Sequence, residues 1–114
     1  MSNDRELLEL AAKALGGVCK HHKTLMGEHP YIQHAGEKFE QWWNPLTDDS
    51  AALRLAVKLK LRFSTVCNEG YESVASSTSF DINVCVEPHN GDPYAATRRA
   101  IVRAASEIGR SMTP

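Results

Sequence analysis

The chain has 114 residues, of which 42% are hydrophobic and 24% are charged, and its formal net charge is −1. These values are typical of a water-soluble globular protein, and they exclude a general electrostatic attraction to nucleic acids or membranes. Direct nucleic-acid binding is therefore not expected. The length predicts one domain spanning residues 1–114, with a core of its own.

No apolar run has transmembrane length, and the first residues are polar and charged. We therefore expect neither a membrane span nor a signal peptide, and we expect a location in the cytoplasm. The three cysteines, Cys19, Cys67 and Cys85, are odd in number and widely spaced. This pattern favours reduced thiols over a disulfide framework.

The first predicted element is a helix over residues 4–15. Asn3 and Glu6 have the spacing of a capping box, and apolar residues from Leu7 onward recur at helical intervals. Gly16 and Gly17 then supply a stop signal.

Residues 18–43 form the least regular part of the sequence. They hold four of the five histidines and both tryptophans, and Gly27, Pro30 and Gly36 interrupt any long element. We predict an ordered loop or a loose hairpin, with short strands at residues 18–23 and 31–34.

The sequence around the two adjacent tryptophans predicts the central helix. Pro45 imposes a turn, and Asp48 and Asp49 suit the first turn of a helix over residues 49–60. Only Arg54 and Lys58 interrupt the apolar residues that follow, so we expect this helix to be buried nearly all round. Alternation over residues 57–63 also fits a strand, and we expect a helix and then a strand in series.

Three strands and a last helix are predicted in the second half. The strands cover residues 61–67, 71–76 and 78–87, with a turn at 68–70. The last strand alternates strictly, so its polar face meets either solvent or the polar side of a helix. One face carries Phe80, Ile82, Val84 and Val86, and the other carries Asp81, Asn83, Cys85 and Glu87. Asp92 and Pro93 begin a helix that runs to about residue 109.

The predicted fold is therefore α+β. A small antiparallel sheet, a meander of about three strands that an N-terminal hairpin could extend, packs with three helices.

Two segments resemble a known family. The sequences WNPLTDD with the helical run to residue 59, and DPYAATRRAIVRAA over residues 92–105, are similar to the phage ABA-sandwich domain proteins. These are small proteins of phages and prophages. The resemblance covers about half of the chain, in residues 43–59 and 92–108, and implies a sheet packed between helices. It also implies a protein encoded by phage or mobile DNA and acting in a bacterial cytoplasm, with no catalytic residues.

The residue types allow two kinds of chemical site to be weighed. Cys19 with the histidines of segment 19–34 supplies ligand types that zinc accepts, but the spacing fits no established zinc motif, and a polar, solvated loop is the simpler explanation. A hydrolase could use a cysteine with His21 or His89 as base, but Cys67 and Cys85 fall in predicted strands, where buried inert thiols are common. Phosphate-binding and serine-hydrolase motifs are missing. We expect no enzyme activity, no cofactor and no metal.

The candidate partner-binding residues are aromatic and basic. One tryptophan should face inward, and Trp43 belongs to the family-like segment, so we predict Trp43 in the core and Trp42 outside. The predicted contact residues are Tyr31, Phe39, Trp42, Arg99 and Arg103. For the arginines of the last helix, a solvated helix face is the simpler explanation.

Three functions follow as hypotheses. The first is a non-enzymatic, phage-encoded inhibitor of a bacterial defence system, anti-CRISPR-like, that occludes a host protein through residues 18–43 and the last helix. The second is a sponge that holds a small nucleotide signal between aromatic rings and arginines. The third is a small metal-dependent hydrolase. The sequence is compatible with a monomer or a homodimer.

Overall fold

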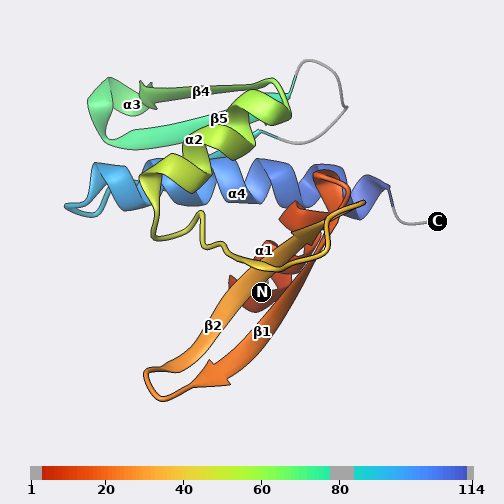
Figure 1. Ribbon diagram of the computed structural model, residues 1–114. Helices are drawn as coiled ribbons and strands as arrows, with labels where there is room; N and C mark the ends of the chain where they lie inside the picture. The colour runs from red at the N-terminus through yellow and green to blue at the C-terminus, as the bar shows by residue number, and fades with distance from the viewer. Residues whose placement is uncertain (1–3, 78–83, 113–114) are drawn as a thin grey trace.

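The computed structural model describes residues 4–77 and 84–112, which form four helices and two three-stranded antiparallel sheets. The predicted α+β class is confirmed. In chain order the elements are α1 (Asp4–Ala14), β1 (Gly17–Thr24), β2 (Gly27–His34), β3 (Gln41–Trp42), α2 (Asp49–Lys58), β4 (Leu61–Val66), α3 (Cys67–Gly70), β5 (Glu72–Ser77), β6 (Cys85–Pro88) and α4 (Pro93–Ser111). Figure 1 shows α4 running through the middle of the molecule.

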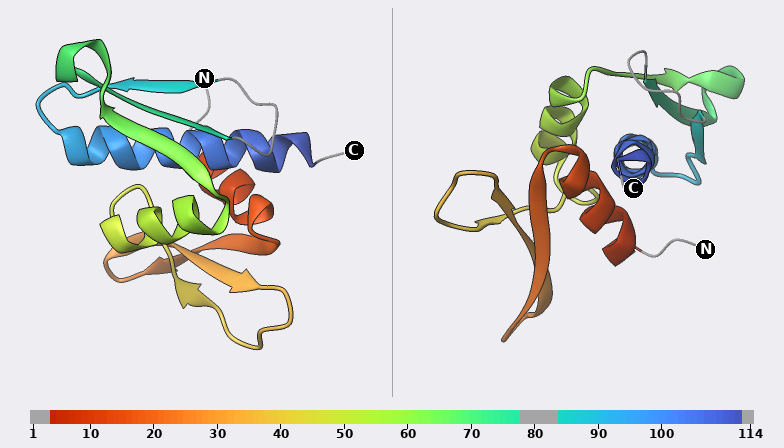
Figure 2. Two further views of the ribbon diagram at one scale, coloured as in Figure 1. Left: turned by 90° about the horizontal axis from the view of Figure 1, so that it is seen from above. Right: turned by 90° about the vertical axis from the view of Figure 1, so that its right-hand side faces the viewer.

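The three long helices lie between the two sheets (Figure 2). We call β1-β2-β3 the hairpin sheet and β4-β5-β6 the meander sheet. The meander sheet covers one side of α4, and α1 and α2 lie between α4 and the hairpin sheet. The N-terminal hairpin therefore does not extend the meander but builds a sheet of its own with β3. The resemblance implied the opposite layer order, with one sheet between helices.

The hairpin sheet is more regular than the sequence predicts. β1 and β2 pair along their full length, from Gly17 opposite His34 to Thr24 opposite Gly27. The prediction that Pro30 interrupts the element is wrong. The Pro30 carbonyl accepts a bond from the Trp43 N–H at 3.2 Å on the side of β3, so the missing proline N–H falls on that side and not in the β1 ladder.

Helix α2 begins as predicted but is only half buried. The Asp48 carboxylate accepts the Ser50 N–H at 3.0 Å, which caps the first turn. Ala52, Leu55 and Ala56 are buried, but Leu53 and Val57 are exposed. The expectation of burial nearly all round is wrong, because α2 packs at the edge of the helical layer and its far side meets solvent.

The meander sheet packs on α4 through small side chains. Ala75 and Cys85 pair across β5 and β6 and lie buried against Ala100 and Ala104 of α4. The polar face of β6 therefore meets a helix, and Val86 faces outward. Part of the predicted strand, residues 78–83, lies outside the described residues.

Helix α4 also packs closely on α1. A Cβ atom added at Gly109 would stand 1.9 Å from the Leu10 carbonyl oxygen. The helix continues to Ser111, so Gly109 does not end it but allows the two backbones to touch.

Candidate functional site

Four rings gather on the outer face of the hairpin sheet, and we call them the aromatic face: His22, His29, Tyr31 and Trp42. The His29 and Trp42 rings are 4.6 Å apart, and Tyr31 meets Trp42 edge-on at 6.0 Å. His22 stands 5.3 Å from Tyr31, and its Nε2 lies 2.7 Å from Glu40 Oε2. Cross-strand pairing explains the cluster, because His22 is opposite His29 and Tyr31 is opposite Trp42.

The two tryptophans face opposite sides of the sheet, as strand geometry requires. Trp42 is 52% exposed in the aromatic face, and Trp43 is 8% exposed in the core. The prediction that Trp43 belongs to the core is confirmed.

Other large apolar side chains extend this exposed region. Phe39, in the loop between β2 and β3, is 77% exposed. Leu25 and Met26, at the tip of the β1–β2 hairpin, are almost wholly exposed. Leu25 and Met26 were not predicted as contact residues. They are the two residues between Thr24 and Gly27, which pair across the hairpin, and Gly27 after them is the local turn signal.

The structure does not bring the predicted arginines to the aromatic face. Arg99 bonds Asp4 of α1 at 2.8 Å, and its Nε lies 3.2 Å from Glu87 of β6. Arg103 bonds the same Glu87 carboxylate at 2.5 Å and the Val86 carbonyl at 2.9 Å. These contacts tie α4 to α1 and to the meander sheet.

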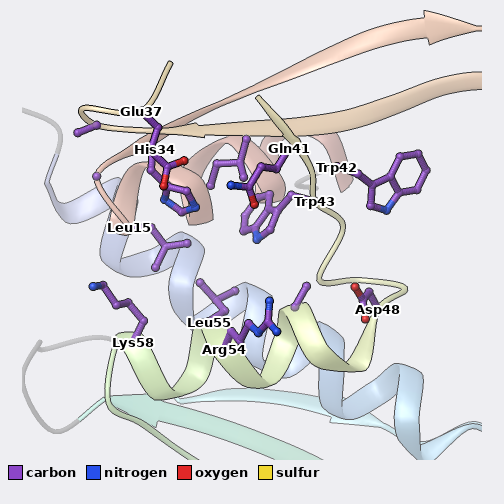
Figure 3. Close-up of a pocket in the computed structure, with 14 residues that line it drawn as sticks. Leu15, His34, Glu37, Gln41, Trp42, Trp43, Asp48, Arg54, Leu55 and Lys58 are labelled. Atoms are coloured by element: carbon purple, nitrogen blue, oxygen red, sulfur yellow. The ribbon is translucent and has the colours of Figure 1, made fainter. Parts of the chain in front are cut away.

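A pocket of about 590 Å³ lies between the hairpin sheet and α2, and both Trp42 and Trp43 line it (Figure 3). Its volume is within the range of small-molecule sites, about 300–1,000 Å³. The apolar part is made by Leu15, Ile32, Trp43, Ala51 and Leu55. Three of these side chains, Ile32, Trp43 and Leu55, belong to the buried core, which gives the pocket a firm floor.

The polar groups of the pocket come from two walls. Arg54 and Lys58, one helical turn apart on α2, form one wall, and His34, Glu37 and Gln41 of the hairpin-sheet side lie opposite (Figure 3). Within residues 4–77 and 84–112, Arg54 and Lys58 make no ion pair. The Asp48 carboxylate also lines the pocket, but it caps α2.

The arrangements that resemble catalytic groups are enclosed. Ser73 Oγ lies 2.9 Å from His89 Nε2 and 2.8 Å from Thr97 Oγ1, but Ser73 is 0% exposed, so no substrate reaches its hydroxyl. Burial raises the pKa of the Cys19 thiol to about 11 and also raises the pKa of Cys85. Both thiols are therefore poor nucleophiles near neutral pH.

In the described part of the chain, no three His, Cys, Asp or Glu side chains are placed to hold a metal ion. None of the described helices is long and apolar enough to cross a membrane.

Comparison with known proteins identified no relative. No family model, no curated protein and no solved structure matches the chain.

Proposed function

We propose that this chain is a non-enzymatic binding protein that docks onto a bacterial host protein through the outer side of its hairpin sheet. The observation that supports this most is the aromatic face, where tryptophan, tyrosine and two histidines form one cluster in which His22 and Trp42 are exposed and His29 and Tyr31 are partly buried. Tryptophan and tyrosine are enriched among residues that dominate binding energy at protein interfaces.

The shape of the hairpin supports the same proposal. β1 and β2 carry Leu25 and Met26 out to a tip, and Phe39 projects from the neighbouring loop. Figure 1 shows the hairpin extending away from the helical layer. An apolar tip flanked by aromatic rings suits insertion into an apolar cleft of a partner, with His22 and Glu40 at a polar rim.

The biological setting of the proposal comes from the family resemblance of residues 43–59 and 92–108. A phage or prophage protein of this size would act by occluding a surface of a host defence complex, with CRISPR-Cas as the first candidate. The sequence also predicts Arg99 and Arg103 as contact residues. In the structure both form ion pairs within the chain, so the proposal gives them a role in holding the fold and not in contacting the partner.

The experiment measures plaque formation by a targeted phage on bacteria with an active CRISPR-Cas system that express this chain. We expect the wild-type chain to restore plaques, and Tyr31→Ser with Trp42→Ser to abolish the effect. The matched control is Tyr71→Ser with Tyr94→Ser, which removes two exposed rings from other surfaces and should leave the effect intact. Co-elution of purified chain and defence complex in gel filtration should follow the same pattern.

Two outcomes would contradict the proposal. If the wild-type chain protects phage against no defence system in a representative panel, the anti-defence role fails. If both double variants protect equally, the aromatic face is not the contact surface.

A further inference from the structure

We infer that the pocket between the hairpin sheet and α2 is a binding site for a small organic anion that carries a flat, hydrogen-bonding ring. The two cations and the apolar floor of this pocket lie on the other side of the Trp42–Trp43 segment from the docking surface proposed above, and the two surfaces share Trp42, which borders the pocket (Figure 3). Its ligand class follows from three features: two cations that pair with no carboxylate among the described residues, a firm apolar floor, and polar groups at the far wall.

We infer the negative charge of the ligand from Arg54 and Lys58, which line the pocket. Two cations at i and i+4 on a helix repel each other, and no carboxylate among the described residues pairs with either one. Arg98 of α4, by contrast, has an acidic partner, the Asp49 carboxylate at 2.6 Å. A phosphate or carboxylate between Arg54 and Lys58 would relieve this repulsion and receive charge-assisted hydrogen bonds from both.

We infer the flat ring of the ligand from Trp43 in the floor of the pocket. Trp43 points into the pocket, above Leu55 (Figure 3), and its position is fixed by burial in the core. An indole surface held in this way offers a stacking platform at little entropic cost, because its side chain is already ordered. A volume of about 590 Å³ accommodates one ring system with its anionic substituent, and it is small for a folded peptide segment.

The hydrogen-bonding requirement follows from the wall opposite α2. His34, Glu37 and Gln41 line it, and the Glu37 carboxylate accepts hydrogen bonds but also repels a second negative charge. The ligand should therefore carry its charge at one end and N–H or amino donors at the other. A nucleoside monophosphate has this chemistry, and so does a heteroaromatic carboxylate.

The chain offers a direct reporter for this site, because Trp42 and Trp43 are its two tryptophans. In Trp42→Phe, Trp43 alone gives the tryptophan fluorescence. We would titrate this variant with adenosine monophosphate, indole-3-carboxylate, adenosine and inorganic phosphate. A saturable change with either anionic ring, at least tenfold weaker with adenosine and with phosphate alone, supports the site. The two anions separate a phosphate source from a carboxylate source.

Charge variants on the same background then locate the anion. Arg54→Gln and Lys58→Gln should each weaken binding by about tenfold or more, since a charge-assisted hydrogen bond is lost. Arg62→Gln is the matched control, because Arg62 is exposed but does not line the pocket. The inference is overturned if neither anionic ring gives a saturable response, or if the two α2 variants bind as tightly as the control. The charge variants differ from one another only at Arg54, Lys58 or Arg62, so their comparison does not decide the docking proposal, which is tested at Tyr31 and Trp42.

Discussion

The two sheets flank the same helical layer but are attached to it in different ways. The meander sheet contacts α4 through small side chains, Ala75 and Cys85, and is fastened by Glu87 to arginines of the helix. On the hairpin side, the large side chains of Ile32 and of Trp43, the residue after β3, join the smaller Cys19 in the core at one end of the sheet. Its other end carries an exposed tip (Figure 1).

This difference explains where the candidate sites lie. Small residues let a sheet and a helix approach closely, which favours a rigid framework. Bulky residues hold the hairpin sheet at a distance from α2, and the pocket occupies the space beside Trp43. The strands that project beyond the core also expose their tip to partners. We therefore assign stability to the meander side and recognition to the hairpin side, and each prediction below tests that division.

The largest expected effect is at the helical layer that both sheets share. Helix propensity alone predicts that Gly109→Ala stabilises by about 1 kcal/mol. The added Cβ would stand 1.9 Å from the Leu10 carbonyl oxygen, so α1 and α4 must move apart, at a cost that we place at about 3 kcal/mol or more. Net destabilisation of at least about 2 kcal/mol should appear in urea unfolding.

Gly36→Ala is the control for this prediction. Gly36 has a φ of +84° but open space around its Cβ position, so only backbone strain of about 1 kcal/mol is expected. Equal costs for the two variants would mean that α1 and α4 separate easily, and the common layer would not be the rigid part of the molecule.

The second prediction concerns the buried thiols, one in each sheet. With a pKa of about 11 in place of 9.0, Cys19 has an ionised fraction about a hundredfold lower at pH 8 than an ordinary thiol. Cys19 and Cys85 should therefore react with iodoacetamide far more slowly than the partly exposed Cys67, as measured by peptide mass spectrometry. Fast modification of Cys19 alone would show that the base of the hairpin sheet opens while the meander sheet stays closed.

The same pKa gives a pH dependence whose sign is fixed. Well below pH 9 the Cys19 thiol is neutral in both the folded and the unfolded chain, so its ionisation has no effect on the free energy of unfolding. Between pH 9 and about 11 the unfolded thiol ionises while the folded thiol stays neutral, and the free energy of unfolding falls as pH rises. Cys19→Ala should show a smaller fall than the wild-type protein over this range.

The third prediction tests the ion pairs of the meander side. Glu87→Gln leaves Arg99 and Arg103 without their shared carboxylate, and we expect a loss of about 1–2 kcal/mol, reduced from the cost at a fully buried site because both arginines are partly exposed. Glu69→Gln, at an exposed turn, should cost less than about 0.5 kcal/mol. No difference between the two variants in thermal unfolding would show that small-residue packing alone holds this sheet.

The sequence predicts the local parts of this fold well, because their signals are local. The Asp48 and Asp92 caps, the helices that follow them and the Asn68–Gly70 turn all depend on neighbouring residues. Pairings between distant segments are different. Pro30 lowered the expectation of a long strand, and only the position of β3 beside it shows that its missing N–H does no harm.

The same contrast between local signals and distant pairings explains why the sequence predicts only part of the candidate sites. Alternation along a strand is enough to separate Trp42 from Trp43, and the structure has them on opposite faces. The ion pairs of Arg99 and Arg103 join residues of α4 to Asp4 and Glu87, which no local pattern brings together. The pocket likewise forms only because the loop with Glu37 lies opposite α2. In the sequence alone, Arg54 and Lys58 look like the solvent-exposed face of an ordinary helix.

The smallest expected effect is at the hairpin tip. Leu25→Ser with Met26→Ser changes two side chains that are almost wholly exposed, so the free energy of unfolding should change by less than about 0.5 kcal/mol. Leu55→Ala is the contrast, because Leu55 is buried in the core and its truncation should cost about 2–5 kcal/mol. If the tip variant instead loses more than about 1 kcal/mol, and the loss grows with protein concentration, the tip is buried in a second copy of the chain. The hairpin side would then serve self-association, and recognition of a host protein would have to use another surface.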